Sequence, residues 1–175
     1  MELLWQIVGF GAMVTIIASF QIKDSKRFVI TQAVAQTLFV IHYFMIGSPS
    51  GAIQNLIAVI RAMMLMSNNK YLTSKAAKYA VMAAFLLSPL LVYERVWDLL
   101  PGVAMLINTY YVWSMNSKMM RLSQAAIVSP LWIAYNLINL SLPGVFTELF
   151  NATSSVVFLV RMKKERQNSV KGDEK

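Results

Sequence analysis

Seven apolar segments, nearly free of charge, follow one another along the chain. They cover residues 3–21, 28–46, 51–67, 79–93, 99–115, 122–140 and 144–161. An apolar segment of about 20 residues crosses a bilayer as a helix, because a helix satisfies all of its own backbone polar groups in hydrocarbon. Several segments are shorter, so we expect their helices to extend into the flanking loops. The pattern predicts an all-helical membrane protein with seven transmembrane helices.

The composition agrees with this class and narrows the chemistry. Of the 175 residues, 57% are hydrophobic and 14% are charged, whereas soluble domains carry about 25% charged residues. We therefore expect one membrane domain and no second, soluble one. The chain has no cysteine and one histidine, and it lacks the HExxH, GxSxG and Gly-rich phosphate motifs. We expect neither an enzyme nor a bound metal or cofactor.

Lysine and arginine gather in alternate loops. Fourteen of the 16 lie in loops 22–27, 68–78 and 116–121 or after residue 160, whereas the opposite loops, 47–50, 94–98 and 141–143, hold Arg95 alone. Basic loops stay in the cytoplasm, so the N-terminus is predicted to lie outside and the basic tail, 162–175, in the cytoplasm. The net charge of +8 then serves topology and lipid headgroups, and we expect no nucleic-acid partner.

Part of the sequence occurs twice. Residues 25–46 match residues 117–138 at 7 of 22 positions when shifted by 92, with Gln32 on Gln124 and Tyr43 on Tyr135. The frame then slips by one, so that Gly51 meets Gly144. We infer two three-helix units, 1–67 and 99–161, joined by a linker, 68–98, with the fourth helix. One linking helix makes the units parallel, a 3+1+3 arrangement about an axis along the membrane normal.

Three short stretches resemble the SWEET and PQ-loop superfamily. They are Ala18-Ser19-Phe20-Gln21, the turn Lys23-Asp24-Ser25-Lys26, and Gly51-Ala52-Ile53-Gln54-Asn55. Over residues 3–162 the chain is similar to small bacterial inner-membrane proteins of the YgjV type. The Pro-Gln pair that names the superfamily is Phe20-Gln21 here, and the second copy has Val112-Trp113.

The resemblance implies an inner-membrane carrier that moves a small polar solute by alternating access. It places a binding asparagine of the third helix on Asn55. The repeat partner of Asn55 is Glu148, so the site is not a symmetric pair of asparagines, and sugar specificity does not carry over.

Three ionisable side chains are expected inside the membrane, where charge is expensive and marks candidate sites. His42 and Glu148 lie about one turn from the outer ends of their helices, at a depth similar to Asn55. One interpretation is a solute or proton site in which Glu148 and His42 exchange a proton. The other is that Glu148 is solvated at the interface and His42 is a packing residue.

Arg61 lies deeper, on the face of the third helix that also carries Asn55. It is stepped about 9 Å below Glu148 at 1.5 Å per residue, so we expect no direct ion pair. Two interpretations stay open: Arg61 snorkels to the cytoplasmic headgroups, or it binds an anionic group. The other candidate substrate contacts are Asn151, Trp132, Tyr43, Tyr135 and Asn136.

We expect Asn55, Glu148 and Asn151 to face one cavity between the two repeats. Gln32, Gln36 and Gln124 are expected to form hydrogen bonds between helices. Two classes of function follow: a carrier of a small polar or aromatic solute, or a non-transporting accessory or receptor-like protein that binds a partner or lipid. A solvated cavity favours the first and a closed interior the second; the sequence leaves homo-oligomerisation open.

Overall fold

The computed structural model describes residues 2–19, 25–114 and 116–173, all of them helical or in the connections between helices. The α-helices are α1 (Glu2–Ser19), α2 (Ser25–Met45), α3 (Pro49–Met66), α4 (Lys75–Leu87), α5 (Leu100–Trp113), α6 (Ser117–Ser123), α7 (Ser129–Ile138) and α8 (Leu142–Asp173). Two 3-10 helices, η1 (Ser88–Val92) and η2 (Val96–Leu99), follow α4, and a π-helical turn, η3 (Gln124–Val128), joins α6 to α7. Phe20-Gln21 and Lys23-Asp24 lie outside the described residues.

The described helices form seven rods, one for each apolar segment. The junctions at Gln124 and Ser129 keep right-handed helical angles, so α6, η3 and α7 form one rod. Three helical stretches, Pro49–Met66, Lys75–Val92 and Leu142–Glu165, are long and apolar enough to cross a membrane, and α1 and α2 contain shorter apolar stretches. The prediction of an all-helical fold is confirmed for the described residues, and three stretches have the length and apolarity of a membrane span. The boundary predicted at residue 161 is not marked by a helix end, because α8 continues to Asp173.

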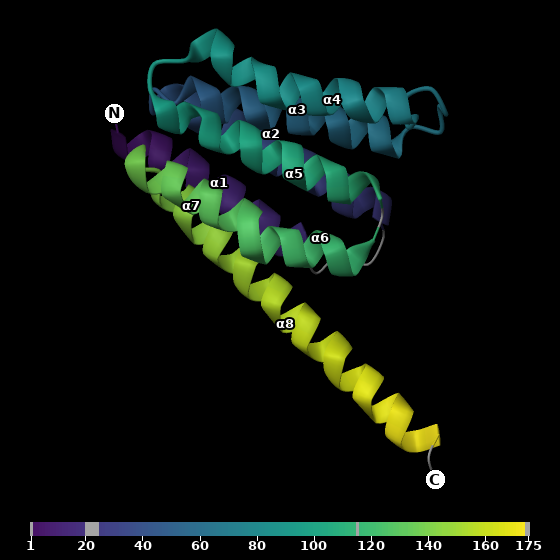
Figure 1. The fold of residues 1–175 in the computed structure, drawn as a ribbon. Coiled ribbons are helices and arrows are strands. Elements are labelled where there is room, and N and C mark those ends of the chain that lie inside the picture. The colour runs from purple at the N-terminus through teal and green to yellow at the C-terminus, as the bar shows by residue number, and fades with distance from the viewer. Residues whose placement is uncertain (1, 20–24, 115, 174–175) are drawn as a thin grey trace.

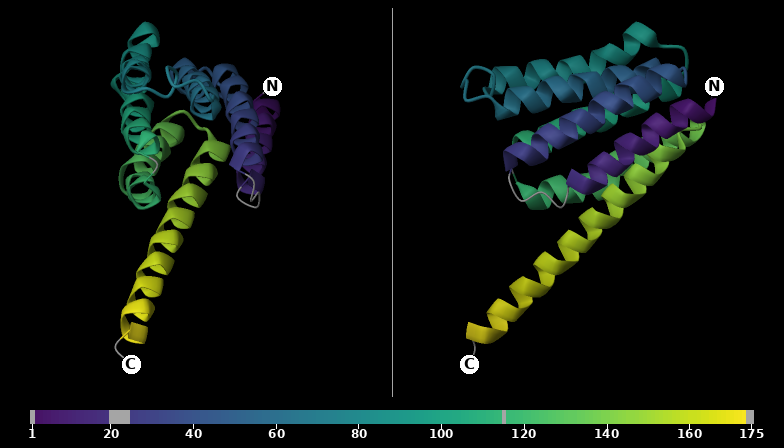
Figure 2. Two further views of the ribbon diagram at one scale, coloured as in Figure 1. Left: turned by 90° about the vertical axis from the view of Figure 1, so that its right-hand side faces the viewer. Right: turned by 180° about the vertical axis from the view of Figure 1, so that it is seen from behind.

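The rods pack mostly in chain order (Figures 1 and 2). Contacts run from α1 to α2, α2 to α3, α3 to α5, α5 to α7, α7 to α8, and from α8 back to α1, while α4 packs against α5 and α3. The C-terminal part of α8 extends away from the other helices (Figure 1). The packing thus brings the first helix, α1, against the last helix, α8.

The connections after α2 and after α7 have the same backbone structure. The Ser48 N–H donates to the Tyr43 carbonyl at 2.8 Å, and the Ser141 N–H donates to the Asn136 carbonyl at 2.9 Å. The residues before these serines, Gly47 and Leu140, have positive φ angles of 73° and 53°. Both connections are Schellman caps, which end a helix with a left-handed residue. A leucine there costs about 1–2 kcal/mol, because its Cβ crowds the following carbonyl.

These caps correct the repeat alignment. The identities from Ser25 to Ala33 keep an offset of 92 residues, whereas the ends of α2 and α7, Met45 and Ile138, are 93 apart. The extra residue lies in η3, where the Ser129 N–H bonds to the carbonyl five residues earlier, because a π turn holds one residue more than an α turn. The predicted slip after residue 46 is therefore wrong.

The correction changes which residues are equivalent. The counterpart of Tyr43 is Asn136, and that of His42 is Tyr135. Pro130 follows η3 after one residue, Ser129, and lies in the first turn of α7. Pro130 has no N–H to donate, so it adds no backbone hydrogen bond across η3.

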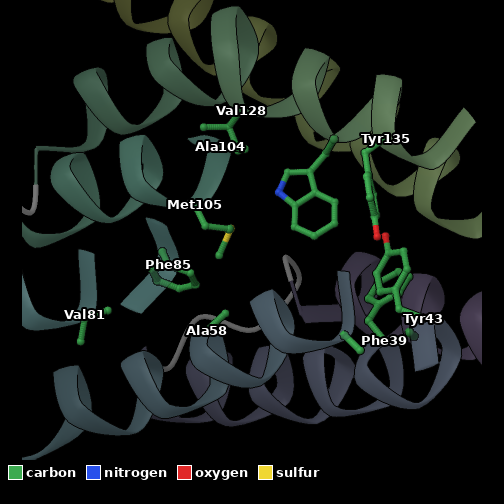
Figure 3. Packing of buried hydrophobic residues seen from close by; sticks show 12 residues of the cluster. Phe39, Tyr43, Ala58, Val81, Phe85, Ala104, Met105, Val128 and Tyr135 are labelled. Carbon is green, nitrogen blue, oxygen red and sulfur yellow. The ribbon is translucent and has the colours of Figure 1, made fainter. Parts of the chain in front are cut away.

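Buried apolar side chains line the space between the rods (Figure 3). Tyr43 and Tyr135 point toward each other from opposite sides, and Phe39 stacks on Tyr43 with ring centroids 5.7 Å apart. Farther along, Phe85 of α4 and Met105 of α5 fill the space beside α3. The polar groups described next are embedded in this apolar packing.

Candidate functional site

Arg61 points into the bundle. Its side chain is 7% exposed, and one terminal nitrogen, Nη1, donates to Asn108 Oδ1 and to Thr109 Oγ1, both at 2.8 Å. The guanidinium carbon also lies 5.4 Å from the ring centre of Phe85. The interpretation that Arg61 snorkels is wrong: α5 and α4 offer it acceptors and an aromatic face inside the bundle. These partners are neutral.

Glu148 is held by neutral donors on two rods. Its Oε2 accepts from Ser129 Oγ at 2.6 Å and from Gln124 Nε2 at 3.2 Å. Its Oε1 accepts from Asn151 Nδ2 at 3.3 Å, one turn along α8. Glu148 and Asn151 therefore share one side of α8.

Two amides connect the guanidinium to the carboxylate. Asn108 Nδ2 donates to Gln124 Oε1 at 3.2 Å, completing a path Arg61–Asn108–Gln124–Glu148, which we call the polar relay. A guanidinium only donates and an ionised carboxylate only accepts, so both amides are oriented with their N–H groups toward Glu148. The charges lie on α3 and α8, and the relay joins them without a direct ion pair.

The π turn builds the binding place of the carboxylate. Gln124 and Ser129 are five residues apart, and in an α-helix they would point roughly 140° away from each other, at 3.6 residues per turn. Instead Gln124 Nε2 lies 2.9 Å from Ser129 Oγ, and both contact the same oxygen of Glu148. The wider turn aligns positions i and i+5. The inserted residue thus creates a two-donor site that the first copy lacks.

A second polar group, the tyrosine cluster (His42, Tyr43, Trp132, Tyr135 and Asn136), lies near the two Schellman caps. Tyr43 donates its hydroxyl to Asn136 Oδ1 at 2.7 Å, and the Gly51 N–H donates to the Tyr135 hydroxyl at 2.9 Å. Trp132 packs against both tyrosines, with ring centroids 5.7 and 5.8 Å away. All five side chains are buried. Tyr43 and Tyr135 thus bond to opposite halves of the chain.

His42 belongs to this cluster and not to the relay. Its Nδ1 lies 2.8 Å from the Trp5 carbonyl oxygen, and its Nε2 lies 2.8 Å from Ser141 Oγ. A neutral ring satisfies both contacts by donating from Nδ1 and accepting at Nε2. Among the described residues, His42 and Glu148 share no hydrogen-bond partner, so the contacts give no support to the expected proton exchange.

The helices approach closely around the tyrosine cluster. A Cβ added to Gly9 would lie 2.4 Å from Pro143 Cγ, one at Gly51 would lie 2.9 Å from the Tyr43 ring, and one at Gly144 would lie 2.5 Å from Asn136 Oδ1. Glycine is required at these positions because any side chain would push two rods apart. This end of the bundle is therefore closed by packing.

Two pockets open elsewhere. A polar pocket of about 50 Å³ lies between the connections near Gly47, Arg95 and Asp98. An apolar groove of about 310 Å³ lies between α2 and α3, at Val34 and Met63. Neither pocket is lined by a residue of the polar relay.

The Imp-YgjV family, described as a bacterial inner membrane protein, matches residues 3–166. The chain belongs to the Imp-YgjV family. No curated protein and no solved structure matches it. Its place is the bacterial inner membrane, which agrees with the apolar helices.

In this Imp-YgjV protein, Asn55 is the candidate that stands apart. Its Nδ2 donates to the Gly51 carbonyl of its own helix at 2.9 Å, so Asn55 joins neither the relay nor the tyrosine cluster in the described structure. Short polar side chains often bond back to their own helix in this way.

The side chains that bond to Arg61 or Glu148 or bridge the two were not among the predicted substrate contacts, apart from Asn151. The others are Asn108, Thr109, Gln124 and Ser129. Gln124 was expected to bond between helices, and it does. The sequence signal that marks the position of Gln124 is the change of the repeat offset from 92 to 93 residues. Its first-copy counterpart, Gln32, makes one side-chain bond among the described residues, of 3.4 Å to Ser19 Oγ.

Proposed function

We propose that this protein is an inner-membrane carrier that moves a small polar solute by alternating access, with the polar relay as its binding site. The observation that carries the proposal is the buried Arg61, whose described partners are all neutral. A charged side chain inside a membrane is costly, and such residues usually belong to a substrate or ion path. A second charge, Glu148, lies at the other end of the same hydrogen-bonded path.

The proposed architecture is two parallel three-rod units, α1–α3 and α5–α8, joined by α4, with the N-terminus outside. The equivalent helix ends and the two equivalent Schellman caps support this arrangement. The relay crosses from α3 of the first unit to α5 of the second. Carriers built from parallel repeats bind their solutes between the repeats.

In this proposal the tyrosine cluster is the closed outer gate. The hydrogen bonds that join the units there include Tyr43–Asn136, Gly51–Tyr135 and His42–Ser141. If one unit rocks against the other, these bonds break together and open the bundle from outside. Trp132 lies on the inner side of the gate, where an aromatic face suits a ring-bearing solute.

The alternative is a non-transporting accessory protein that binds a partner or lipid. The observation in its favour is the close packing of Gly9, Gly51 and Gly144 across the rods, since a permanently closed bundle has no need to separate there. In a carrier, buried positions become accessible to water from each side of the membrane in turn. In a permanently closed accessory protein they stay buried.

Thiol labelling tests this difference without knowledge of the solute. The chain has no cysteine, and Ser155 is buried with no hydrogen-bond partner for its hydroxyl, so Ser155→Cys introduces one reactive group at little cost. A carrier exposes this thiol to a membrane-impermeant reagent in both right-side-out and inverted vesicles. Protection in both preparations would refute alternating access.

Two exposed loop positions serve as controls for the vesicles. Under the proposed topology, Glu94→Cys reacts only from outside and Asn69→Cys only from the cytoplasmic side, because both residues are exposed in opposite loops. A preparation in which each control reacts from one side alone has intact membranes of known orientation.

A further inference from the structure

We propose that the solute is a zwitterion, whose carboxylate binds Arg61 and whose ammonium group binds Glu148. This inference rests on the proposed carrier function and on the polar relay as its site. The chemical class of the solute follows from the hydrogen-bond donors of Arg61 and the hydrogen-bond acceptor of Glu148 that the relay leaves unused.

Arg61 keeps free donors. A guanidinium has five N–H groups, and the two described hydrogen bonds of Arg61 both start from Nη1. No hydrogen bond between the described residues uses Nε or Nη2. These two nitrogens form the edge of the guanidinium that grips a carboxylate with two parallel bonds. The relay therefore fixes Arg61 by one nitrogen and leaves its anion-binding edge unused.

Glu148 keeps a free acceptor. Oε2 already has two donors, Ser129 and Gln124. Among the described residues, Oε1 has one long contact of 3.3 Å, from Asn151. A carboxylate oxygen accepts about two hydrogen bonds, so Oε1 has room for an N–H donor. Among charged groups, an ammonium is the natural partner of this oxygen.

Charge balance selects a solute that carries both ends. The relay holds one positive and one negative charge, so its net charge is zero. A bound monoanion would leave a net negative charge in the low-dielectric interior, and a bound amine would leave a net positive one, each at a large solvation cost. A zwitterion adds no net charge. The two intervening amides also keep Arg61 and Glu148 from neutralising each other directly.

Two further buried groups make the interior suitable for a polar guest. Gln36 Oε1 and Ser155 Oγ are buried and have no hydrogen-bond partner among the described residues, which is rare for polar atoms in proteins. Gln36 lies two turns from Tyr43 on the same side of α2, and Ser155 lies two turns from Glu148 on the same side of α8. Along their helices, Gln36 lies beyond Tyr43 and Ser155 lies beyond Glu148, in both cases on the side away from the Schellman caps.

Matched solutes test the class. Purified full-length protein is heated with γ-aminobutyrate, butyrate or butylamine, which share a chain length and differ in their charged ends. A ligand that binds the folded state raises the unfolding temperature in a saturable way. The expected result is a rise with γ-aminobutyrate alone. Glycine, β-alanine and 5-aminovalerate then measure the spacing of the two binding ends.

Charge variants sharpen the test. Glu148→Gln gives the relay a net positive charge, so the preference should move from γ-aminobutyrate to butyrate. Arg61→Met gives a net negative charge and should move it to butylamine. Arg61→Lys keeps the charge but loses the two-pronged edge, so the apparent Kd for the zwitterion should rise about tenfold or more, the factor of one charge-assisted hydrogen bond. If an Arg61 variant does not fold, the near-isosteric Glu148→Gln variant still tests whether loss of the negative charge moves the preference to butyrate.

Two outcomes would overturn the inference. Equal stabilisation by butyrate and γ-aminobutyrate would make the solute an anion. No stabilisation by any of the four zwitterions, with Ser155→Cys still labelled from both sides, would leave the carrier proposal standing and remove the zwitterion. Protection of Ser155→Cys from both sides would instead refute the carrier itself.

Discussion

Tyr43 and Asn136 occupy equivalent positions before the two Schellman caps, and they bond to each other. The Tyr43 hydroxyl donates to Asn136 Oδ1 at 2.7 Å, so the contact joins one repeat to the same place in the other. The corresponding glycines, Gly51 and Gly144, pack against Tyr43 and Asn136 respectively. In each copy a glycine packs against the residue at this position, which carries an aromatic ring in the first copy and an amide in the second.

This bond should contribute to stability. Tyr43→Phe removes the donor and leaves Asn136 Oδ1 unpaired in a buried place, where Asn136 Nδ2 already has no partner. We expect a loss of about 1–3 kcal/mol in the free energy of unfolding, measured by thermal unfolding in detergent. Tyr71→Phe is the control, because Tyr71 is 76% exposed in a loop. Equal stability of the two variants would contradict a stabilising role of the bond.

Two glycines of α1 should respond differently to alanine. Gly9→Ala places a Cβ 2.4 Å from Pro143 Cγ and 2.7 Å from His42 Nδ1, so α1 and α8 must separate, at about 1–3 kcal/mol. Gly11→Ala meets no atom within 4 Å and should stabilise the helix by up to about 1 kcal/mol. The unfolding temperatures of the two variants measure the difference. A Gly9→Ala variant as stable as Gly11→Ala would refute the close contact.

The repeat partners Gln124 and Gln32 should differ in importance. Gln124→Leu breaks the relay by removing its contacts with Asn108, Ser129 and Glu148. We expect about 2–4 kcal/mol of destabilisation, because polar groups are left unpaired in the interior. Gln32→Leu removes a single 3.4 Å bond and should cost less than about 1 kcal/mol. Chemical unfolding of both variants provides the comparison, and similar losses would argue against the relay.

The proposed orientation predicts a cytoplasmic C-terminus. Fusion of a fluorescent protein after Lys175 should give fluorescence, and fusion of alkaline phosphatase there should give no activity, because that enzyme folds only outside the cytoplasm. Expression of both fusions is compared by immunoblot. The reverse pattern would overturn the orientation inferred from fourteen basic residues against one.

Glu148→Gln should stop solute movement without unfolding the protein. The glutamine oxygen can still accept from Ser129, so the packing around η3 is kept, whereas the negative charge at the end of the relay is lost. Transport of γ-aminobutyrate into vesicles, compared with the parent protein, checks the expectation. Unchanged uptake by a correctly inserted variant would exclude Glu148 from the site.

The helical class and the approximate limits of the seven rods followed from the sequence, because a bilayer requires long apolar segments and a helix satisfies its own backbone. The ionisable residues Arg61 and Glu148 were found in the same way, since charge stands out in an apolar segment. The identities Tyr43–Tyr135 and Ile46–Ile138, in contrast, misaligned the repeats. Identical residues do not reveal a π turn, because such a turn changes the backbone hydrogen bonds and requires no particular amino acid.

The sequence by itself determined that the chain is a helical membrane protein, that part of it is repeated, and that Arg61 and Glu148 are costly to bury. Only the tertiary structure decided their partners. Whether Arg61 turned to the headgroups or to the interior depended on acceptors at Asn108 and Thr109, which lie 47 and 48 residues away in the chain. Such contacts depend on how α3 packs against α5, and no local pattern encodes the energy of that packing.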